Sequence, residues 1–273
     1  MSPPMFQTLP NGKVTYATDG PLALVTLTNP PANGYSYEMM RDLDEAVLRA
    51  RFDDAVEVLV LAGAGEKFFC AGADIAMLDA VTPTFKYAFC LHANETLLRL
   101  EHTPKLVIAA LGGHCVGGGL EIALAADLRF ARKGSGKCGL PEITLGVLPG
   151  TGGTQRLARA VGKSKAIELM ANGELFDYET AERLGLVNRV LDAKDEAGFL
   201  AQVTEIARGY CTPKKAAMGV GHIKRAVQTG AELPLEAGLA LERELQAKLF
   251  ASADAKEGIA AFVEKRPARF QGR

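Results

Sequence analysis

Short apolar runs alternate with helical patterns through the first part of the chain, and this alternation limits the fold more than any other feature. Runs rich in Val, Ile and Leu predict strands, and the longer amphipathic segments between them predict helices. Strands and helices that alternate at this spacing indicate α/β layering. The predicted strands are Val14–Thr18, Leu22–Leu27, Val56–Leu61, Leu106–Leu111, Leu128–Ala131 and, late in the chain, Leu186–Leu191.

Polar residues and glycines mark where several helices begin and end. Ser36 is expected to cap a helix that continues to about Ala50. Thr82–Pro83 is expected to open a second helix that runs to about Leu100. Two further N-caps and one C-cap are predicted, at Ser164, Asp177 and Gly185 respectively.

The pattern becomes wholly helical after about Ala201, with helices expected near 213–229, 234–250 and 254–265. We therefore predict two regions. Residues 1–200 form an α/β core that carries the functional site, and residues 201–273 form a helical region.

The charge balance argues against several classes of partner. The 273 residues include 31 Lys and Arg against 32 Asp and Glu, so a net charge of −1 gives no general attraction to nucleic acid or to an anionic membrane. No segment approaches the roughly 20 apolar residues of a membrane helix. We expect neither a nucleic-acid nor a membrane partner, and any acidic ligand must be bound by local groups.

The five cysteines are not closely paired and form no Cys-x-x-Cys, which disfavours a zinc site or a disulfide framework. The four histidines also lack a metal-like spacing, so no metal site is predicted. The first twelve residues contain no arginine and no apolar run. These features predict a cytoplasmic protein in a reducing compartment, although a processed organellar enzyme would show the same ones.

Three glycines and a glutamate follow one of the predicted strands. After Leu106–Leu111 comes a glycine-rich segment that ends in Gly117–Gly118–Gly119, and then a strong helix former over Leu120–Ala126. N–H groups at a helix start are free and carry the positive end of the helix dipole, and glycine lets a ligand oxygen approach them. Such a segment can form an oxyanion hole, but a tight turn between strand and helix would have the same sequence.

One glutamate follows these glycines directly, and a second lies further along the chain. Carboxylates can act as general acids and bases. Glu121 comes directly after the glycines, and Glu142 lies in a downstream Leu-Pro-Glu segment. A second loop, Phe68–Ile75, can supply another N–H donor. Both glutamates also have ordinary interpretations, as a solvated acid in a first helical turn and as a loop or capping acid. A phosphate loop is disfavoured, because no Lys-Ser or Lys-Thr follows the glycines.

Four ordered motifs resemble the enoyl-CoA hydratase/isomerase, or crotonase, superfamily. Each motif alone is weak, but their succession in one chain is specific, and the resemblance extends from about residue 27 to residue 266. The motifs are Phe69–Ile75, Gly117–Glu121, Leu140–Ile143 and Leu148–Leu157.

The resemblance implies a crotonase-like spiral of ββα turns followed by a C-terminal helical region used for trimerisation. It implies acyl-CoA thioesters as substrates and no cofactor beyond the coenzyme A that the substrate carries. The expected assembly is a homo-oligomer, either a trimer or a dimer of trimers.

The resemblance also implies roles for individual residues. Glu121 matches the main activator of water, and Glu142 matches the proton donor to the substrate Cα. The N–H groups of Ala73 and Gly118 match the donors to the thioester oxygen, and Gly150 matches a glycine near the catalytic water. We expect the hydroxyls of the segment around Gly150 to serve only a turn into the next helix. The positions implied to contact the acyl-CoA are Ala71, Ala73, Asp74, Ile75, Gly118, Phe250 and Lys265, the last two from this subunit or a neighbouring one.

Two departures from the family pattern affect these expectations. Ala76 stands where many relatives have a lysine, so a phosphate contact from that position is lost. The chain between the two glutamates looks one residue longer than usual through Arg132–Lys137, which either shifts Glu142 or enlarges a surface turn.

The predicted function is that of an enoyl-CoA hydratase, which adds water to a 2-enoyl-CoA. One alternative is a Δ3,Δ2-enoyl-CoA isomerase, which needs a single shuttling carboxylate, most simply Glu142. Others are a hydratase of a specialised branched or aromatic acyl-CoA, and an RNA-binding or scaffold protein on the same fold. The acyl chain is not specified by the sequence.

Overall fold

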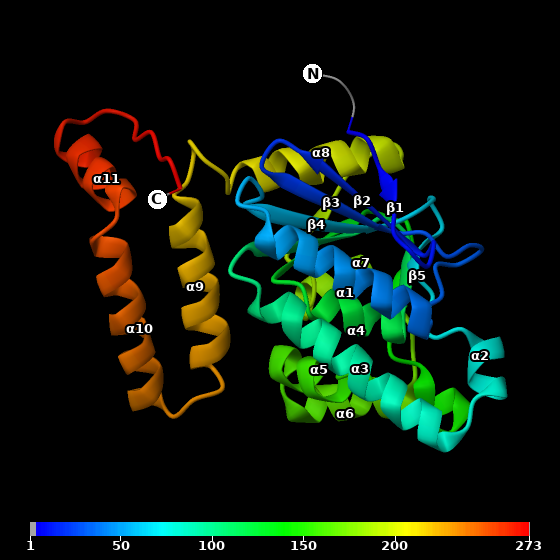
Figure 1. The fold of residues 1–273 in the computed structure, drawn as a ribbon. Coiled ribbons are helices and arrows are strands. Elements are labelled where there is room, and N and C mark those ends of the chain that lie inside the picture. Colours follow the sequence, from blue (N-terminus) through cyan, green and yellow to red (C-terminus); the bar gives the residue numbers. More distant parts are fainter. Residues whose placement is uncertain (1–3, 273) are drawn as a thin grey trace.

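The computed structural model describes residues 4–272 and contains one large, mostly parallel β-sheet (Figure 1). Its order is β1-β2-β3-β4-β6-β8-β11, and every pairing from β3 onward is parallel. The strands are β1 (Gln7–Thr8), β2 (Val14–Asp19), β3 (Leu22–Leu27), β4 (Val58–Gly63), β6 (Leu106–Leu111), β8 (Leu128–Arg132) and β11 (Arg189–Leu191). All six predicted strands are present, with β4 beginning two residues later and β11 three residues later than expected.

A second, four-stranded sheet has the order β10-β9-β7-β5. The bounds of its strands are β5 (Phe68–Cys70), β7 (His114–Val116), β9 (Lys137–Gly139) and β10 (Phe176–Asp177). These strands are two or three residues long, and the sequence patterns did not predict them.

The chain alternates between the two sheets in a regular way. In three successive units, one strand enters the large sheet, the next enters the small sheet, and a helix follows. This arrangement confirms the predicted spiral of ββα turns. The units are β4, β5, α2 (Ile75–Ala80) and α3 (Pro83–His102); β6, β7 and α4 (Gly118–Leu124); and β8, β9 and the 3-10 helix η1 (Glu142–Leu145).

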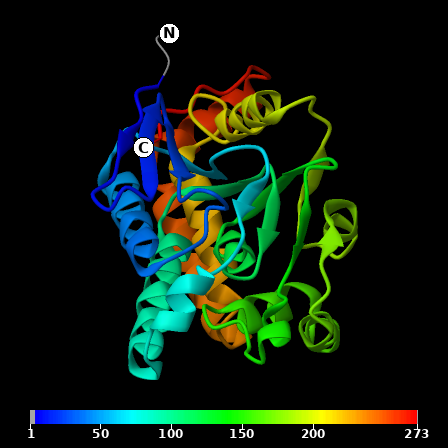
Figure 2. The ribbon, with the colours of Figure 1, turned by 90° about the vertical axis from the view of Figure 1, so that its right-hand side faces the viewer.

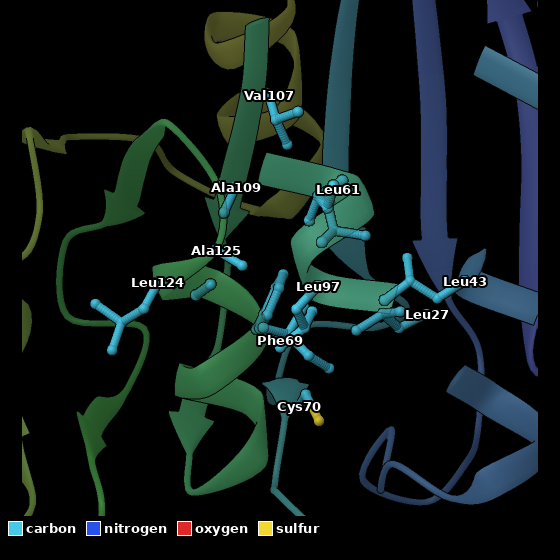
Figure 3. Close-up of a cluster of buried hydrophobic side chains, with 14 of the residues drawn as sticks. Leu27, Leu43, Leu61, Phe69, Cys70, Leu97, Val107, Ala109, Leu124 and Ala125 are labelled. Carbon is cyan, nitrogen blue, oxygen red and sulfur yellow. The ribbon is translucent and has the colours of Figure 1, made fainter. Parts of the chain in front are cut away.

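The hydrophobic core lies on both faces of the large sheet. Along β4, Leu59 and Leu61 belong to one buried cluster, whereas Val58 and Val60 belong to the other, as the two-residue period of a strand requires. Figure 3 shows part of the first cluster, where Leu61 lies near residues from neighbouring elements. Each fully buried Leu or Val side chain contributes about 1.5–3 kcal/mol, so this double-sided core fixes the strands that carry the site.

Most predicted helix caps are confirmed. Ser36 Oγ accepts from Met39 N at 3.3 Å at the start of α1 (Tyr37–Phe52). Thr82 Oγ1 accepts from Phe85 N at 3.2 Å at the start of α3. Asp177 caps α7 (Tyr178–Arg183), and Gly185 follows that helix with a φ of 76°.

The predicted cap at Ser164 is wrong. Helix α5 (Gly153–Val161) ends at Gly162, and α6 (Lys163–Asn172) begins directly after it. Gly162 has a φ of 83°, so this one glycine makes the corner between the two helices. Ser164 is therefore already inside the first turn of α6.

The C-terminal helices form a separate layer beside the core. Helix α8 (Glu196–Arg208) still packs on the large sheet through Phe199, Val203 and Ala207, so the expected boundary at residue 200 falls inside it. Helices α9 (Ala217–Gly230), α10 (Leu235–Phe250) and α11 (Ala253–Val263) follow within a few residues of their predicted positions. Figure 1 shows them beside the core, and in Figure 2 they lie behind it. Among residues 4–272, no helix is long and apolar enough to cross a membrane.

Candidate active site

The small sheet brings the predicted site together. Its strands β5, β7 and β9 are mutually parallel, with Cys115 paired to both Cys70 and Cys138. Parallel strands end at the same edge of a sheet, which is where open α/β sheets bind ligands. The segment after β5 leads to Ala73, the segment after β7 carries the three glycines, and the segment after β9 carries Glu142.

All three glycines are required by close contacts, and a Cβ atom on Gly119 would lie 2.2 Å from the backbone oxygen of Cys70. Gly117 has φ 54° and ψ −127°, and a Cβ atom there would lie 2.8 Å from Oε1 of Glu142. A Cβ atom on Gly118 would lie 2.1 Å from Cε1 of Tyr35. The absence of a Cβ atom at Gly117 leaves room for Glu142, and its absence at Gly118 leaves room for Tyr35.

Two backbone N–H groups are available for an oxygen atom at this edge. Tyr35 N donates to Gly72 O at 2.8 Å and Asp74 N donates to Tyr35 O at 3.1 Å, so the N–H of Ala73 takes no part in this bridge. Gly118 is the first residue of α4, and its N–H has no partner within the helix. Neither N–H donates a hydrogen bond within the described part of the chain.

The two donor loops touch each other. A Cβ atom on Gly72 would lie 2.9 Å from Val116 O and 3.3 Å from the N atom of Gly118. The residues predicted to hold the thioester oxygen, Ala73 and Gly118, therefore lie on adjoining backbone segments. Two converging donors are the arrangement that stabilises an oxyanion.

The carboxylate of Glu121 is buried and bound on both oxygens. The residue as a whole is only 1% exposed. Oε1 accepts from Thr151 N at 2.7 Å and from Gly153 N at 2.8 Å, and Oε2 accepts from Thr151 Oγ1 at 2.6 Å. Gly153 begins α5, so the carboxylate also faces the positive end of that helix dipole. These contacts favour a charged acceptor.

Glu142 is held differently. Its Oε2 is buried and has no hydrogen-bond partner among the described residues. Burial, together with the charge of Glu121, raises the pKa of this carboxyl to about 7, against the opposing effects of its own backbone N–H and of Lys86. Near neutral pH, Glu142 can therefore carry a proton that it is able to donate.

Comparisons with known proteins agree with this geometry. The family model described as enoyl-CoA hydratase/isomerase matches residues 18–273. A probable enoyl-CoA hydratase of Rhizobium meliloti is 42% identical over 94% of this chain and 96% of its own length. A short-chain-enoyl-CoA hydratase of Clostridium acetobutylicum is 35% identical over 91% and 93% of the two chains.

A solved structure is also similar over nearly its whole length. The crystal structure described as "Enoyl-CoA hydrates" from Geobacillus kaustophilus has a TM-score of 0.91 and 43% identity, covering 96% of this chain and 97% of that one. The chain belongs to the enoyl-CoA hydratase/isomerase family. It is thus a member of an enzyme family in which the named relatives are hydro-lyases.

The other residues that the family pattern singled out fall into two groups. Those near the glycines lie at the same edge: Ala71 N donates to Ala32 O at 3.0 Å, and Asp74 caps α2 by accepting from Met77 N at 3.2 Å. Ile75 is 60% exposed on that helix. These residues adjoin Ala73 in the chain, and their expected contact with an acyl-CoA stays a prediction.

Phe250 and Lys265 belong to the second group, which the single chain does not bring to the site. Phe250 ends α10, and Lys265 follows α11, on the layer that stands apart from the core in Figure 1. Their expected contact with an acyl-CoA stays a prediction.

Gly150 directly precedes the loop that binds Glu121. A Cβ atom at Gly150 would lie 3.1 Å from Sγ of Cys90. The expectation that hydroxyls in this segment serve only a turn is wrong for Thr151, because its Oγ1 binds Glu121 directly.

The extra residue expected relative to the family pattern falls in the segment Arg132–Lys137. It lies in the turn between β8 and β9, where Ser135 N donates to Arg132 O at 3.2 Å. The register of β9 is fixed afterwards by the pairing of Val116 with Gly139. Whichever of the two expected effects the longer segment has, the shift of Glu142 or the larger turn, stays a prediction.

Sequence reasoning missed Tyr35 as a residue of this site. Its ring lies against Gly118, and its hydroxyl lies 2.9 Å from Thr151 Oγ1. An aromatic residue after a turn carries no signal for such a role, because its partner is 116 positions away.

Proposed function

We propose that this protein is an enoyl-CoA hydratase, which reversibly adds water in a syn manner to a 2-enoyl-CoA to give a 3-hydroxyacyl-CoA. The observation that carries the proposal is a pair of glutamates beside two free backbone N–H groups: Glu121 is buried with three donors, and Glu142 is half-buried with one oxygen that has no partner. Relatives named as enoyl-CoA hydratases support the same reaction and substrate class.

The N–H groups of Ala73 and Gly118 hold the thioester oxygen in this mechanism. Addition of water at Cβ moves negative charge onto that oxygen, and fixed donors stabilise the enolate that results. Loss of one such donor typically raises a barrier by about 2.7–4 kcal/mol.

The two glutamates divide the proton transfers. Glu121, which accepts three hydrogen bonds, takes a proton from water as the oxygen attacks Cβ. Glu142, whose pKa is raised to about 7 by burial, gives its proton to Cα. Dehydration reverses both transfers, so the pair carries one proton at the start of either direction. Because the addition of OH to Cβ and of H to Cα involves no net oxidation or reduction, and the two glutamates carry both proton transfers, we propose that the reaction needs neither a metal nor a redox cofactor.

The proposal includes a homo-oligomer, trimer or dimer of trimers, in a cytoplasmic location. Phe250 and Lys265 lie on the outlying C-terminal layer, so in such an assembly they would contact an acyl-CoA bound to a neighbouring core. Sedimentation of the purified chain measures the assembly state directly.

The reaction is tested with a panel of short, branched and aromatic 2-enoyl-CoAs, following loss of the conjugated thioester absorbance. Glu121→Gln and Glu142→Gln should each lower kcat by roughly 10²–10⁴-fold, the usual contribution of one general acid or base. Undiminished hydration by both variants would contradict the mechanism, and no hydration of any substrate by the wild type would contradict the function.

The isomerase alternative is distinguished by its product. A 3-enoyl-CoA given to the wild type should be converted slowly or not at all, because Glu121 and Glu142 are both present and arranged for the addition of water. Accumulation of a 2-enoyl-CoA without hydration, unaffected by Glu121→Gln, would favour the isomerase instead.

A further inference from the structure

We propose that Tyr35 is a positioning residue, which acts through the hydroxyl of Thr151 to fix the carboxylate of Glu121. The inference rests on the proposed function, because it assigns Glu121 the role of the base. It adds a residue that lies outside the motifs of the family pattern.

The direction of the hydrogen-bond chain follows from counting protons. Thr151 Oγ1 carries one proton and donates it to Glu121 Oε2 at 2.6 Å. Tyr35 OH, 2.9 Å from Thr151 Oγ1, must then be the donor in its own bond. The two bonds form a directed chain from the phenol of Tyr35 to the carboxylate of Glu121.

The phenol of Tyr35 stays protonated at any working pH. Burial raises the pKa of Tyr35 far above its ordinary value, and the charge of Glu121 raises it further. The Tyr35 end of the chain therefore keeps its donor as the pH changes. A Thr hydroxyl that rotates freely would lack this fixed orientation.

The chain leaves Glu121 with limited acceptor capacity. An ionised carboxylate has about four acceptor positions, and protein donors fill three of them here. Thr151 supplies two of the three, through its N–H and its hydroxyl. Fixing Thr151 therefore selects the direction from which a water molecule reaches the base.

Tyr35 is also connected to both proposed oxyanion donors. Its backbone forms the bridge to the strand segment that contains Ala73, and its ring occupies the space where Gly118 would otherwise carry a Cβ atom. The ring packs against Phe89, with centroids 5.4 Å apart. One residue thus links the base to the N–H groups that hold the thioester oxygen.

The decisive substitution is Tyr35→Phe, which removes one oxygen atom and keeps the ring and the backbone bridge. We expect kcat to fall about fivefold, the value of one neutral hydrogen bond, with KM unchanged within twofold. Thr151→Val removes the charge-assisted bond as well, and should lower kcat about 10–100-fold. Thr151→Ser keeps the hydroxyl and should recover most of that loss.

The matched control is Tyr16→Phe. The hydroxyl of Tyr16 is also buried, but it has no hydrogen-bond partner in the described part of the chain. This variant loses the same atom far from the glutamates and should keep the wild-type kcat.

The double variant Tyr35→Phe/Thr151→Val separates a relay from simple packing. If Tyr35 acts through Thr151, the double variant should be no slower than Thr151→Val alone. Wild-type kcat in Tyr35→Phe, a rise in KM alone, or effects that multiply in the double variant would each overturn the inference.

If the wild type hydrates no enoyl-CoA, the proposed function alone has failed. The inference can then still be tested with the wild type, Tyr35→Phe, Thr151→Val and the double variant. Their free energies of unfolding in urea should then be non-additive, because Tyr35 and Thr151 share one chain to a buried charge. Additive losses would overturn the relay on structural grounds.

Discussion

The loop around Glu121 and the short helix around Glu142 give two glutamate side chains opposite hydrogen-bonding surroundings. Residues 151–153 offer three donors to Glu121, two of them backbone N–H groups at the start of α5. The 3-10 helix η1 leaves Oε2 of Glu142 buried without a partner. Burial alone does not set the charge of a carboxyl group; the donors that accompany burial do.

The difference in hydrogen-bond donors allows Glu142 to serve as the acid and Glu121 as the base, although both are glutamates. A carboxyl with donors on both oxygens is suited to stay charged, whereas one that is buried without them is suited to keep its proton. Three kinds of measurement test this contrast: the activity of two glycine variants, the pH dependence of kcat/KM, and the stability of two glutamate variants.

The largest effect is expected from the glycine that adjoins Glu142. A Cβ atom in Gly117→Ala would meet Oε1 of Glu142 at 2.8 Å, at a φ of 54° that side chains rarely adopt. We expect kcat to fall at least about 100-fold, because misplacement of an acid by about 1 Å can cost this much.

Gly153→Ala is the counterpart on the other carboxylate. Its Cβ atom would lie 2.9 Å from Cβ of Pro149 and 3.0 Å from Oε1 of Glu121, so both neighbours must shift, but the backbone of Gly153 is helical and accepts a side chain. A loss of about tenfold, equal to about 1.4 kcal/mol of barrier, is expected. Equal effects of the two substitutions would argue against the contrast between the two sites.

The second effect is the pH dependence of kcat/KM. The productive pair holds one proton, and Glu142, whose pKa is about 7 because of burial, loses it as the pH rises. Above pH 7, kcat/KM should therefore fall by about tenfold per pH unit. Hydration and dehydration must share this limb, because the overall reaction releases no proton. A profile that stays flat to pH 9 in both directions would show that Glu142 is not the acid.

The smallest effect concerns stability. The folded-state pKa of Glu142 is raised from 4.5 to about 7, so the unfolded state loses its proton first and stability falls as the pH rises through this window. Glu142→Gln avoids this loss. We expect it to raise the free energy of unfolding at pH 8 by about 1 kcal/mol, after allowing for partial solvent exposure, and to have little effect near pH 4.

Glu121→Gln should change stability in the opposite direction. It replaces charge-assisted bonds with neutral ones and should lower the free energy of unfolding by about 1–2 kcal/mol. Urea unfolding of both variants at the two pH values measures the contrast. A stabilised Glu121→Gln would mean that the donors around residue 121 do not favour its charge.

The large sheet and the helices that cover it were predictable because their signals are long. Six-residue apolar strands such as Leu106–Leu111, and side-chain caps such as Ser36, are local patterns that the core then stabilises. The two glutamates and the glycines were predictable as candidates, because ordered motifs placed them in one chain.

The small sheet and the support for Glu121 were not predictable from local patterns. Strands of two or three residues, such as Phe68–Cys70, are too short to show a period. The pairing of Tyr35 with Thr151 joins positions that only the tertiary fold brings together. The predicted cap at Ser164 failed for a local reason, because Gly162 had already made the turn.

The ring of Tyr35 against Gly118 restricts the order in which this site can change by mutation. Any side chain at position 118 would collide with the ring, since its Cβ atom alone would lie 2.1 Å from Cε1 of Tyr35. A smaller residue at position 35 would have to come first, and it would take away the donor to Thr151. Substitutions at positions 35, 118 and 151 are therefore epistatic with one another. A substitution that is neutral in a relative without this tyrosine can be harmful here.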